Sequence, residues 1–222
     1  MKKIFFVFAV CCVAITATAD VVRVNSFKQN NSAYQKETAK VRDLTDNSGA
    51  MGKGFCPFAI GLLPSVEIPA ENWDVFFLRI NIFVGRHNNV YGLDLGCVGN
   101  EVKNNFIGVQ SAGIYNKIGY SDGALQFAGI VNRSLGDFYG VQAASILNST
   151  DGVLTGLQIG VLNRATELSG LQLGLVNIAR AGSGVQLGVW NSAKNFEGIQ
   201  IGLGNYNEGS SIEFLPVMNF GF

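Results

Sequence analysis

The phrases GLQIGVLN, GLQLGLVN, GVQLGVWN and GIQIGLGN begin at Gly156, Gly170, Gly184 and Gly198, so one unit recurs every 14 residues. Upstream, the glutamine of the unit recurs at steps of 16 residues, and two earlier units carry an arginine and an aspartate in its place. A fixed period of this kind is the signature of a repeat architecture. The nine residues in this slot are Arg79, Asp94, Gln110, Gln126, Gln142, Gln158, Gln172, Gln186 and Gln200.

Within one unit the residues alternate in character. From Gly156 to Val161, aliphatic side chains alternate with glycine and glutamine. This period of two predicts a β-strand with one aliphatic side and one small or polar side. The glycines argue against a helix, since each interior glycine costs a helix about 1 kcal/mol. The asparagine that ends each unit is typical of a turn.

Two architectures fit these strands. We predict an all-β fold, an antiparallel up-and-down β-barrel of about 10–12 short strands built from the 14–16-residue repeats, with the aliphatic side facing lipid and glutamine facing the lumen. The alternative is a β-solenoid or an open repeat sheet, and in the solenoid the aliphatic side would be the core and glutamine an outer ladder. The 16-residue units have one more residue between Gln126 and Asn132 than the 14-residue units have between Gln158 and Asn163. We expect a β-bulge to absorb it.

The chain terminus favours the barrel. The segment FLPVMNFGF resembles the C-terminal strand by which bacterial outer-membrane barrels are recognised for assembly, and the residues of this signal are Phe214, Met218, Phe220 and Phe222. In a barrel, Arg79 and Asp94 on neighbouring strands would face each other and neutralise their charges. Separate solvation of these two residues is the alternative.

The N-terminus predicts export. Lys2 and Lys3, a run of about a dozen apolar residues and the small residues of Ala17–Ala19 form a secretory signal peptide. The sequence therefore divides into a signal peptide (1–19), a polar N-terminal arm (20–54) and a repeat β domain (55–222). The arm would be a periplasmic arm, a lumen plug or a disordered leader. In an oxidising compartment Cys56 and Cys97 would form a disulfide or remain two buried thiols.

Composition argues against several functions. The 16 basic and 16 acidic residues balance, which gives no electrostatic footprint for nucleic acid. Catalysis is not expected, because the one histidine, His87, shows no partners in the sequence. Clustered metal ligands and a phosphate-binding loop are also lacking in the sequence pattern, so we expect no metal and no cofactor.

The segment NWDVFFLRINIFVGRHNNVYGLDLG, followed by GVQ…GIYN and GLQIGVLN units, resembles a family of exported bacterial surface-repeat proteins found in spirochaetes, Bacteroidetes and relatives. The chain departs from that pattern at Phe76, Phe77, Gly99 and Gly204. The resemblance implies a location in the outer membrane or at the cell surface, and no reaction. We therefore expect a barrel with a structural or narrow-pore role whose partners are outer-membrane lipid and the barrel assembly machinery. The alternative is a secreted or surface-attached repeat protein that binds or adheres to an unknown ligand.

Overall fold

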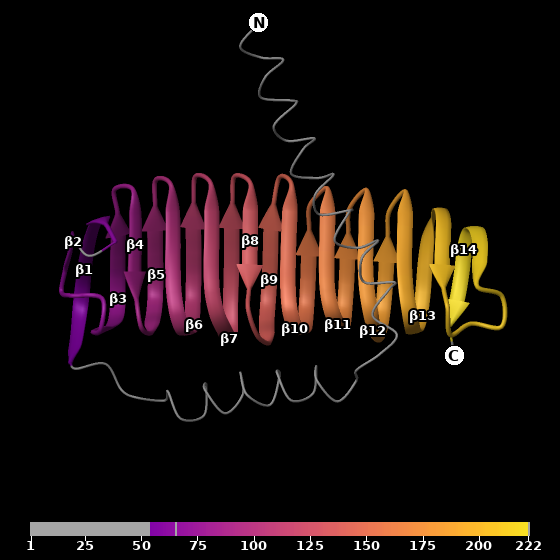
Figure 1. Ribbon diagram of the computed structural model, residues 1–222, viewed down its shortest axis with the longest axis horizontal. Coiled ribbons are helices and arrows are strands. Elements are labelled where there is room, and N and C mark those ends of the chain that lie inside the picture. Colours follow the sequence, from indigo (N-terminus) through magenta and orange to yellow (C-terminus); the bar gives the residue numbers. More distant parts are fainter. Residues whose placement is uncertain (1–53, 65, 222) are drawn as a thin grey trace, which may run out of the picture. The chain divides into compact units, whose positions relative to one another are not determined.

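The computed structural model describes residues 54–64 and 66–221, which lie within one compact unit of the chain, Ala50–Phe222. Their fold is all-β: fourteen strands form one sheet that winds into stacked coils (Figure 1). The strands are β1 (Phe55–Leu63), β2 (Val66–Ile68), β3 (Asp74–Asn81), β4 (Val84–His87), β5 (Val90–Gly96), β6 (Gly99–Ala112), β7 (Tyr115–Ala128), β8 (Val131–Ser134), β9 (Phe138–Ala144), β10 (Leu147–Ile159), β11 (Leu162–Leu173), β12 (Val176–Leu187), β13 (Trp190–Asn207) and β14 (Phe214–Gly221).

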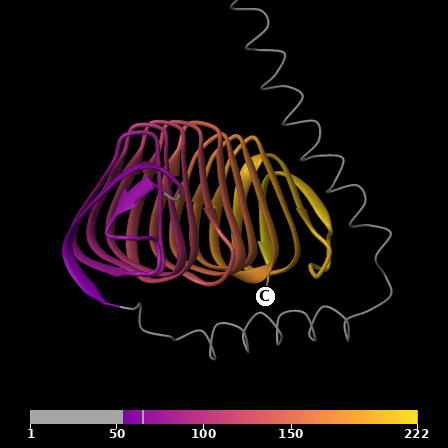
Figure 2. The same ribbon diagram turned by 60° about the vertical axis from the view of Figure 1, so that its left-hand side comes forward.

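The fold is a β-solenoid and the prediction of an antiparallel barrel is wrong. Strands of successive repeats pair in parallel and in register, so that Gln158 lies beside Gln172 and Gly156 beside Gly170. Antiparallel pairing among the described residues is confined to the two ends, at β1–β2 and β13–β14. A two-residue alternation of side chains is expected in both architectures, because a strand has an inner and an outer side in a barrel and in a solenoid. The solenoid alternative therefore matches the structure, as the turned view of the stacked coils makes plain (Figure 2).

Each coil is a flattened loop with two strand segments. In β10, Asn148 belongs to the first segment and Gln158 to the second, and both side chains are fully buried. We call the two segments of every coil the Asn strand and the Gln strand. A turn at Gly160 and Val161 leads from the Gln strand to the next Asn strand. Every repeat thus makes one full circuit and returns one strand spacing, about 4.8 Å, along the axis.

The sides of the strands are the reverse of those expected for a solenoid. Glutamine points into the core, and the aliphatic residues on either side of it point outward. The asparagine that was expected to lie in a turn lies in a strand instead, and its side chain is buried in the core. Two narrow apolar rows complete the interior, and members of these rows include Val90, Phe106, Phe138, Leu154, Leu168, Phe196, Val102, Ile118, Ala165, Ala179 and Ala193.

The buried glutamines form a hydrogen-bonded ladder. Each Nε2 donates to Oε1 of the glutamine in the preceding coil, as Gln172 does to Gln158 at 2.8 Å. From Gln110 to Gln200 these bonds measure 2.7–2.9 Å. A buried amide without partners would cost about 1–3 kcal/mol, and the ladder removes that cost at every step but the last. The last acceptor, Gln200 Oε1, is buried and has no partner.

The buried asparagines form a second ladder that runs the other way. Each Nδ2 donates to Oδ1 of the next coil, as Asn163 does to Asn177 at 2.9 Å. The same Nδ2 of Asn163 also donates to the carbonyl of Leu173, so the asparagine ties the two segments of its own coil together. The members of this ladder are Asn81, Asn100, Asn116, Asn132, Asn148, Asn163, Asn177, Asn191 and Asn205.

A column of glycines stacks beside the glutamine ladder. At Gly170 φ is +149°, and a Cβ atom there would lie 2.1 Å from the carbonyl oxygen of Gly156. Only glycine combines this backbone conformation with so close an approach of the next coil. The stacking therefore favours glycine two residues before the glutamine wherever φ is positive, and Ala124 takes this position in the one coil of the glutamine ladder that lacks the glycine.

The change from 16 to 14 residues is made at the two turns. In the longer coils the Gln strand continues to Ala128 or Ala144 before the turn, whereas in the shorter ones it ends at Leu173 or Leu187. One residue is thus lost at this turn, where a β-bulge was expected within the strand. The other is lost on the opposite edge, where the register shifts between Thr150 and Val153.

Both ends of the sheet carry strands that do not continue the coil. β2 lies at one edge, and β14 at the other runs antiparallel to β13. β14 contains Pro216, and Val217 has φ of 70°. Proline lacks the N–H that would bond a further strand, so an edge strand of this kind discourages end-to-end stacking of solenoids.

Candidate functional site

The main candidate site is an apolar surface on the outer side of the Gln strands. The residues immediately before and after each of the nine slot residues point outward. Together with the neighbours of Ala59 and Asn219, which continue the slot line at its two ends, they form two straight rows across eleven strands, and we call these the face rows. The first face row is Phe58, Leu78, Leu93, Val109, Leu125, Val141, Leu157, Leu171, Val185, Ile199 and Phe220. The second is Ile60, Ile80, Leu95, Ser111, Phe127, Ala143, Ile159, Leu173, Leu187, Ile201 and Met218.

A third row extends this surface over the turns. It consists of one aliphatic or aromatic residue per turn and is here called the turn row: Phe83, Val98, Ile114, Ile130, Ile146, Val161, Leu175, Val189 and Leu203. Backbone hydrogen bonds stack it, as from Val189 N to Leu175 O at 2.9 Å. Six of its nine members are exposed, among them Leu175 at 54% and Leu203 at 75%, and the other three, Val98, Ile130 and Ile146, are half-buried. The three rows together are the apolar face.

The apolar face is large for a single chain. Eleven strands at about 4.8 Å give a length of about 50 Å, and three rows at about 6.6 Å intervals give a width of about 15 Å. The resulting area is on the order of 700 Å², whereas the largest apolar patch of an ordinary monomer is about 300–600 Å². All its members but Ser111 are apolar. In soluble proteins, apolar patches above this size are typical of interaction sites.

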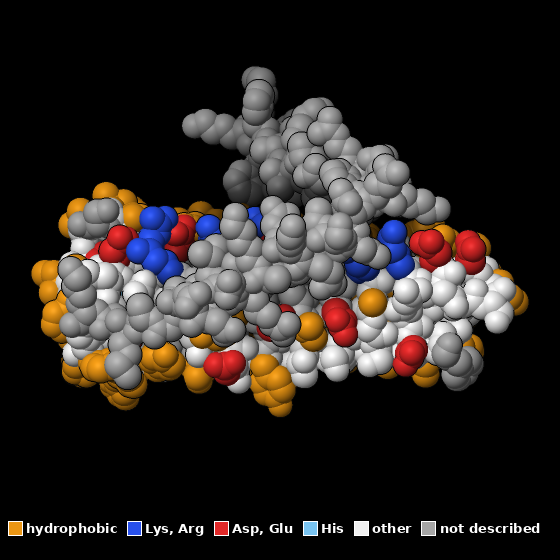
Figure 3. Space-filling model, turned by 60° about the horizontal axis from the view of Figure 1, so that its bottom comes forward, with side chains coloured by type: hydrophobic (Ala, Val, Ile, Leu, Met, Phe, Trp, Pro, Cys, Tyr) orange, Lys and Arg blue, Asp and Glu red, His pale blue; other side chains and the backbone are white. Residues whose placement is uncertain are grey.

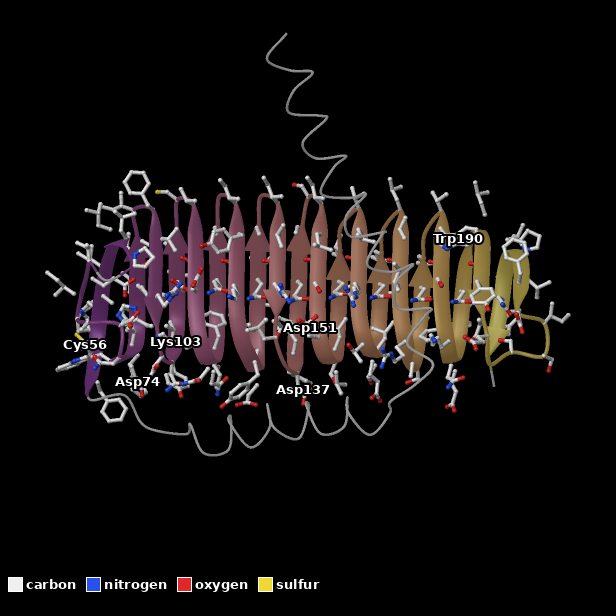
Figure 4. All side chains as sticks on the ribbon, viewed as in Figure 1. Cys56, Asp74, Lys103, Asp137, Asp151 and Trp190 are labelled. Carbon is white, nitrogen blue, oxygen red and sulfur yellow. The ribbon has the colours of Figure 1, made fainter. Side chains whose placement is uncertain are left out.

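Charged side chains lie on the opposite edge of the coils. Figure 4 places Asp137 and Asp151 in its lower half, away from Trp190, which adjoins the turn row near the top. Figure 3 looks at that lower edge and shows charged side chains over it, with hydrophobic side chains along the border. Two of these charges pair, Arg133 with Asp151 at 2.9 Å. The solenoid is therefore polarised across its width, from an apolar edge to a charged edge.

Aromatic rings widen the apolar face at its N-terminal end. Phe55, Phe76 and Tyr91 come from β1, β3 and β5. The ring centroid of Phe76 lies 5.2 Å from that of Phe55 and 5.1 Å from that of Tyr91. Phe58 and Phe77 form a second, edge-to-face pair beside them at 5.7 Å. Such pairs are preferred arrangements of aromatic side chains, and most of these rings remain half-exposed.

A buried cluster of charges closes the N-terminal end of the glutamine ladder. The guanidinium of Arg79 donates to both carboxylate oxygens of Asp94, and Asp94 Oδ2 accepts from Gln110 Nε2 at 2.7 Å. Arg79 Nη1 also lies 3.3 Å from His87 Nδ1, and His87 Nε2 lies 3.2 Å from the carbonyl of Pro69. The cap strand β2 adds Glu67, whose Oε2 lies 3.3 Å from His87 Nδ1.

Burial sets the protonation of this cluster. Desolvation, followed by the charge of Arg79, lowers the pKa of His87 to about 4. The imidazole is thus neutral at pH 7, with its proton on Nε2 directed at Pro69 O and its Nδ1 free to accept from Arg79. Desolvation also raises the pKa of Glu67, whose Oε2 atom is buried and has no hydrogen-bond donor. His87 and Arg79 are fully buried, so this cluster supports the cap and offers no open site to a substrate.

Two shallow notches are found in the described residues. The smaller, of about 370 Å³, lies beside Arg86, Glu101 and Lys117. The larger has a volume of about 540 Å³, lies at the charged edge between Glu167 and Glu197, and forms where Gly182 stands in the interior row between Leu168 and Phe196. None of the residues that line the larger notch is a buried polar side chain that would orient a ligand.

The structure places the sequence-derived site residues as follows. All nine slot residues lie in one buried line, and Arg79 and Asp94 are in contact within it. Of the terminal row, Phe214, Met218 and Phe220 are exposed on β14, and Phe222 lies outside the described residues, as do the expected signal peptide and nearly all of the predicted arm. Cys56 and Cys97 carry free thiols, and Cys97 is exposed.

Sequence reasoning missed the asparagine ladder and the turn row. The asparagines recur with the same steps as the glutamines, and that shared period is a signal that could have identified them as core residues. The turn row was read in part as strand, because Val161 continues the alternation of Leu157 and Ile159.

Comparison with known proteins finds no family model that matches the chain, and no curated protein or solved structure of significant similarity. No helix in the described part of the chain is long and apolar enough to cross a membrane. Within the same residues, no three His, Cys, Asp or Glu side chains are grouped as a metal site.

Proposed function

We propose that this chain is an exported, non-catalytic protein of the bacterial cell surface, a β-solenoid that attaches through its apolar face to another apolar surface. The observation that carries the proposal is that face, in which 21 of the 22 members of the two face rows are apolar. The expected signal peptide and the resemblance to surface-repeat proteins support the location. The pore role expected for a barrel is not part of this proposal.

The energetics favour attachment. Removal of about 700 Å² of apolar surface from water is worth on the order of 17 kcal/mol at about 25 cal/mol per Å². Association costs about 4–15 kcal/mol in lost freedom of motion. The surplus is enough for a stable contact.

The ladders make the surface rigid before it binds. Amide bonds of 2.6–3.0 Å join every coil to the next on both sides of the core. A surface that is already ordered loses little conformational entropy on contact. The repeated coil thus acts as a stiff support for a flat row of aliphatic side chains.

Cell fractionation tests the proposal. The full chain would be expressed in a Gram-negative host as wild type, as the face variant Leu125→Asp/Ile159→Asp, and as the edge variant Ser183→Asp/Asn195→Asp. Both variants add two acidic groups at outward positions, so charge is matched. We expect the wild type and the edge variant to remain with the envelope, and the face variant to be released in folded form, with retention at least about tenfold lower.

Two results would contradict the proposal. One is complete release of folded wild-type protein from the envelope. The other is equal retention of the face variant and the wild type, which would show that another part of the chain makes the attachment.

A further inference from the structure

We infer that the surface covered by the apolar face is the acyl-chain region of a lipid membrane, and that the solenoid lies along the membrane with its turn row inserted. This inference rests on the proposed function and names the partner of the same site. It follows from the shape of the apolar face, from the distribution of charge around it and from the sign of that charge.

The shape of the apolar face fits a fluid partner. Apolar residues continue from the face rows over the turn and onto the start of the Asn strands, where the outward residues are Tyr115, Val131, Leu147, Leu162, Val176 and Trp190. This surface is a convex ridge. A second copy could cover the flat face rows but would leave Leu175 and Leu203 in water. Acyl chains deform around a ridge and cover all of it.

The turn row runs along the whole solenoid at one level. The turns lie side by side along the upper edge in Figure 1, from β3 to β13. Insertion of one turn therefore brings the others to the same depth, with the solenoid axis parallel to the membrane plane. Insertion end-on is disfavoured, because the N-terminal end holds the charges of Glu67, Arg86 and Glu101.

Charge lies where a membrane surface requires it. The three rows contain no charged residue. On the opposite edge, six and eight residues along the chain from Val161 and Val189 of the turn row, Glu167 and Glu197 are exposed. At about 3.3 Å per residue this edge lies about 20 Å from the turn row. The charged edge remains in water while the turn row is in the acyl region.

The sign of the charge nearest the apolar face bears on the kind of lipid surface. The full chain has 16 basic and 16 acidic residues and so no net charge. A protein held by anionic headgroups carries a basic cluster, with each Lys or Arg near the surface contributing about 1 kcal/mol. The basic residues nearest the apolar face lie in one row on the Asn strands: Arg86, Lys117, Arg133 and Arg164. Arg86 is paired with Glu101 and Arg133 with Asp151, and the chain as a whole is neutral. Binding therefore rests on apolar burial, and the membrane need not be anionic.

Vesicle flotation tests this inference. The exported full chain would be purified and mixed with phosphatidylcholine vesicles at low and high salt, with and without anionic phosphatidylglycerol. We expect flotation with phosphatidylcholine alone, no loss at high salt and no gain from anionic lipid. The turn variant Leu175→Asp/Leu203→Asp should bind about 100-fold more weakly, and the edge variant Ser183→Asp/Asn195→Asp should bind as the wild type does.

A fluorescent probe reports the orientation. In a Cys56→Ser/Cys97→Ser background, an environment-sensitive fluorophore at Leu175→Cys should shift to the blue on addition of vesicles. The same fluorophore at Asp137→Cys should not shift. A shift at both positions, or at Asp137→Cys alone, would overturn the orientation.

Other partners give different results. Binding to anionic vesicles alone, with loss at high salt, would overturn the inference in favour of an electrostatic contact. Absence of flotation would also overturn it. If the chain then sediments as a dimer that Leu125→Asp/Ile159→Asp dissociates, the partner is a second copy. A non-floating monomer with a probe at Leu125→Cys protected from labelling would show that another segment of the chain covers the face. If cells retain the protein through its apolar face but vesicles do not bind it, the proposed function stands and only the assignment of lipid as the partner is overturned.

Discussion

Arg79 and Asp94 form a bidentate ion pair inside the core, with Nε 2.7 Å from Oδ1 and Nη2 2.6 Å from Oδ2, and both side chains are fully buried. The pair occupies the position that seven glutamines fill in the following coils. Asp94 accepts from Gln110, and Arg79 neutralises the carboxylate from the other side. The ladder thus begins on an acceptor without a free buried charge.

The first prediction concerns this pair. Asp94→Gln leaves a buried guanidinium without its counter-charge and should lower the free energy of unfolding by about 3–5 kcal/mol. The double variant Arg79→Gln/Asp94→Gln places the ladder's usual residue in both coils and should recover most of the loss. Urea unfolding of both variants and the wild type measures this. A double variant as unstable as the single one would show that the ladder needs the ion pair to begin.

The second prediction concerns position in the ladder. Gln172→Leu removes a donor from Gln158 and an acceptor from Gln186, so both neighbours lose a partner in the ladder. Within the ladder Gln200→Leu affects Gln186 alone, because Gln200 Oε1 has no partner to lose, and outside the ladder it removes the bond to the carbonyl of Tyr206. At about 1–3 kcal/mol for each group left unpaired, the loss of stability at Gln172 should exceed that at Gln200. Equal losses in the free energy of unfolding, measured with urea, would argue against a ladder in which each hydrogen bond contributes independently.

The third prediction concerns the glycine column. Gly170→Ala places a methyl group 2.1 Å from the carbonyl oxygen of Gly156 in a backbone conformation that alanine avoids, and it should cost more than about 3 kcal/mol. Gly123→Ala is the matched control, because its Cβ atom would meet nothing within 4 Å. Thermal unfolding of the two variants should separate them by many degrees. Similar melting temperatures would contradict the close stacking of the coils.

The fourth prediction concerns pH. The pKa of His87 is about 4 in the folded chain and about 6.5 when exposed, so between these values the unfolded chain binds a proton that the folded chain does not. Stability should therefore fall by up to about 3 kcal/mol as the pH is lowered from 6.5 to 4. The raised pKa of Glu67 acts in the opposite sense, since its contribution is present at low pH and lost as the pH rises through the folded pKa.

Two variants separate these effects. His87→Gln should flatten the decline between pH 6.5 and 4, and Glu67→Gln should make it steeper because the opposing group is gone. Urea unfolding at a series of pH values gives both slopes. An unchanged slope in His87→Gln would assign the acid sensitivity to other groups.

The sequence predicted the strands but not how they join. Alternation around Gln158 identifies a strand with two different sides, and the period identifies the nine slot residues that the structure aligns in one line. Parallel or antiparallel pairing depends on whether the chain reverses or circles at each turn. That is decided by contacts between coils, such as the donation from Asn163 to Asn177 Oδ1, which no single unit reveals.

The choice of the inner side could not be read from hydrophobicity. Glutamine is an unfavourable core residue unless its amide is fully paired, and a single repeat contains no partner for it. Pairing arises only when identical coils stack, so the burial of Gln158 and Asn148 is a property of the repeat array. The aliphatic rows were expected to face lipid in a barrel, and they do point outward here, but from a closed core without a lumen.

The two ladders have consequences for the length of the array. Each primary amide has a dipole, and in each ladder these dipoles align head to tail. The glutamine amides donate toward the N-terminal end and the asparagine amides toward the C-terminal end, so the two fields oppose each other along the axis. An added coil contributes one amide to each ladder and so leaves the electric moment of the rod nearly unchanged. Duplication of one 14-residue coil would therefore not increase the net dipole along the axis. We expect that longer or shorter solenoids can be made by gain or loss of whole repeats.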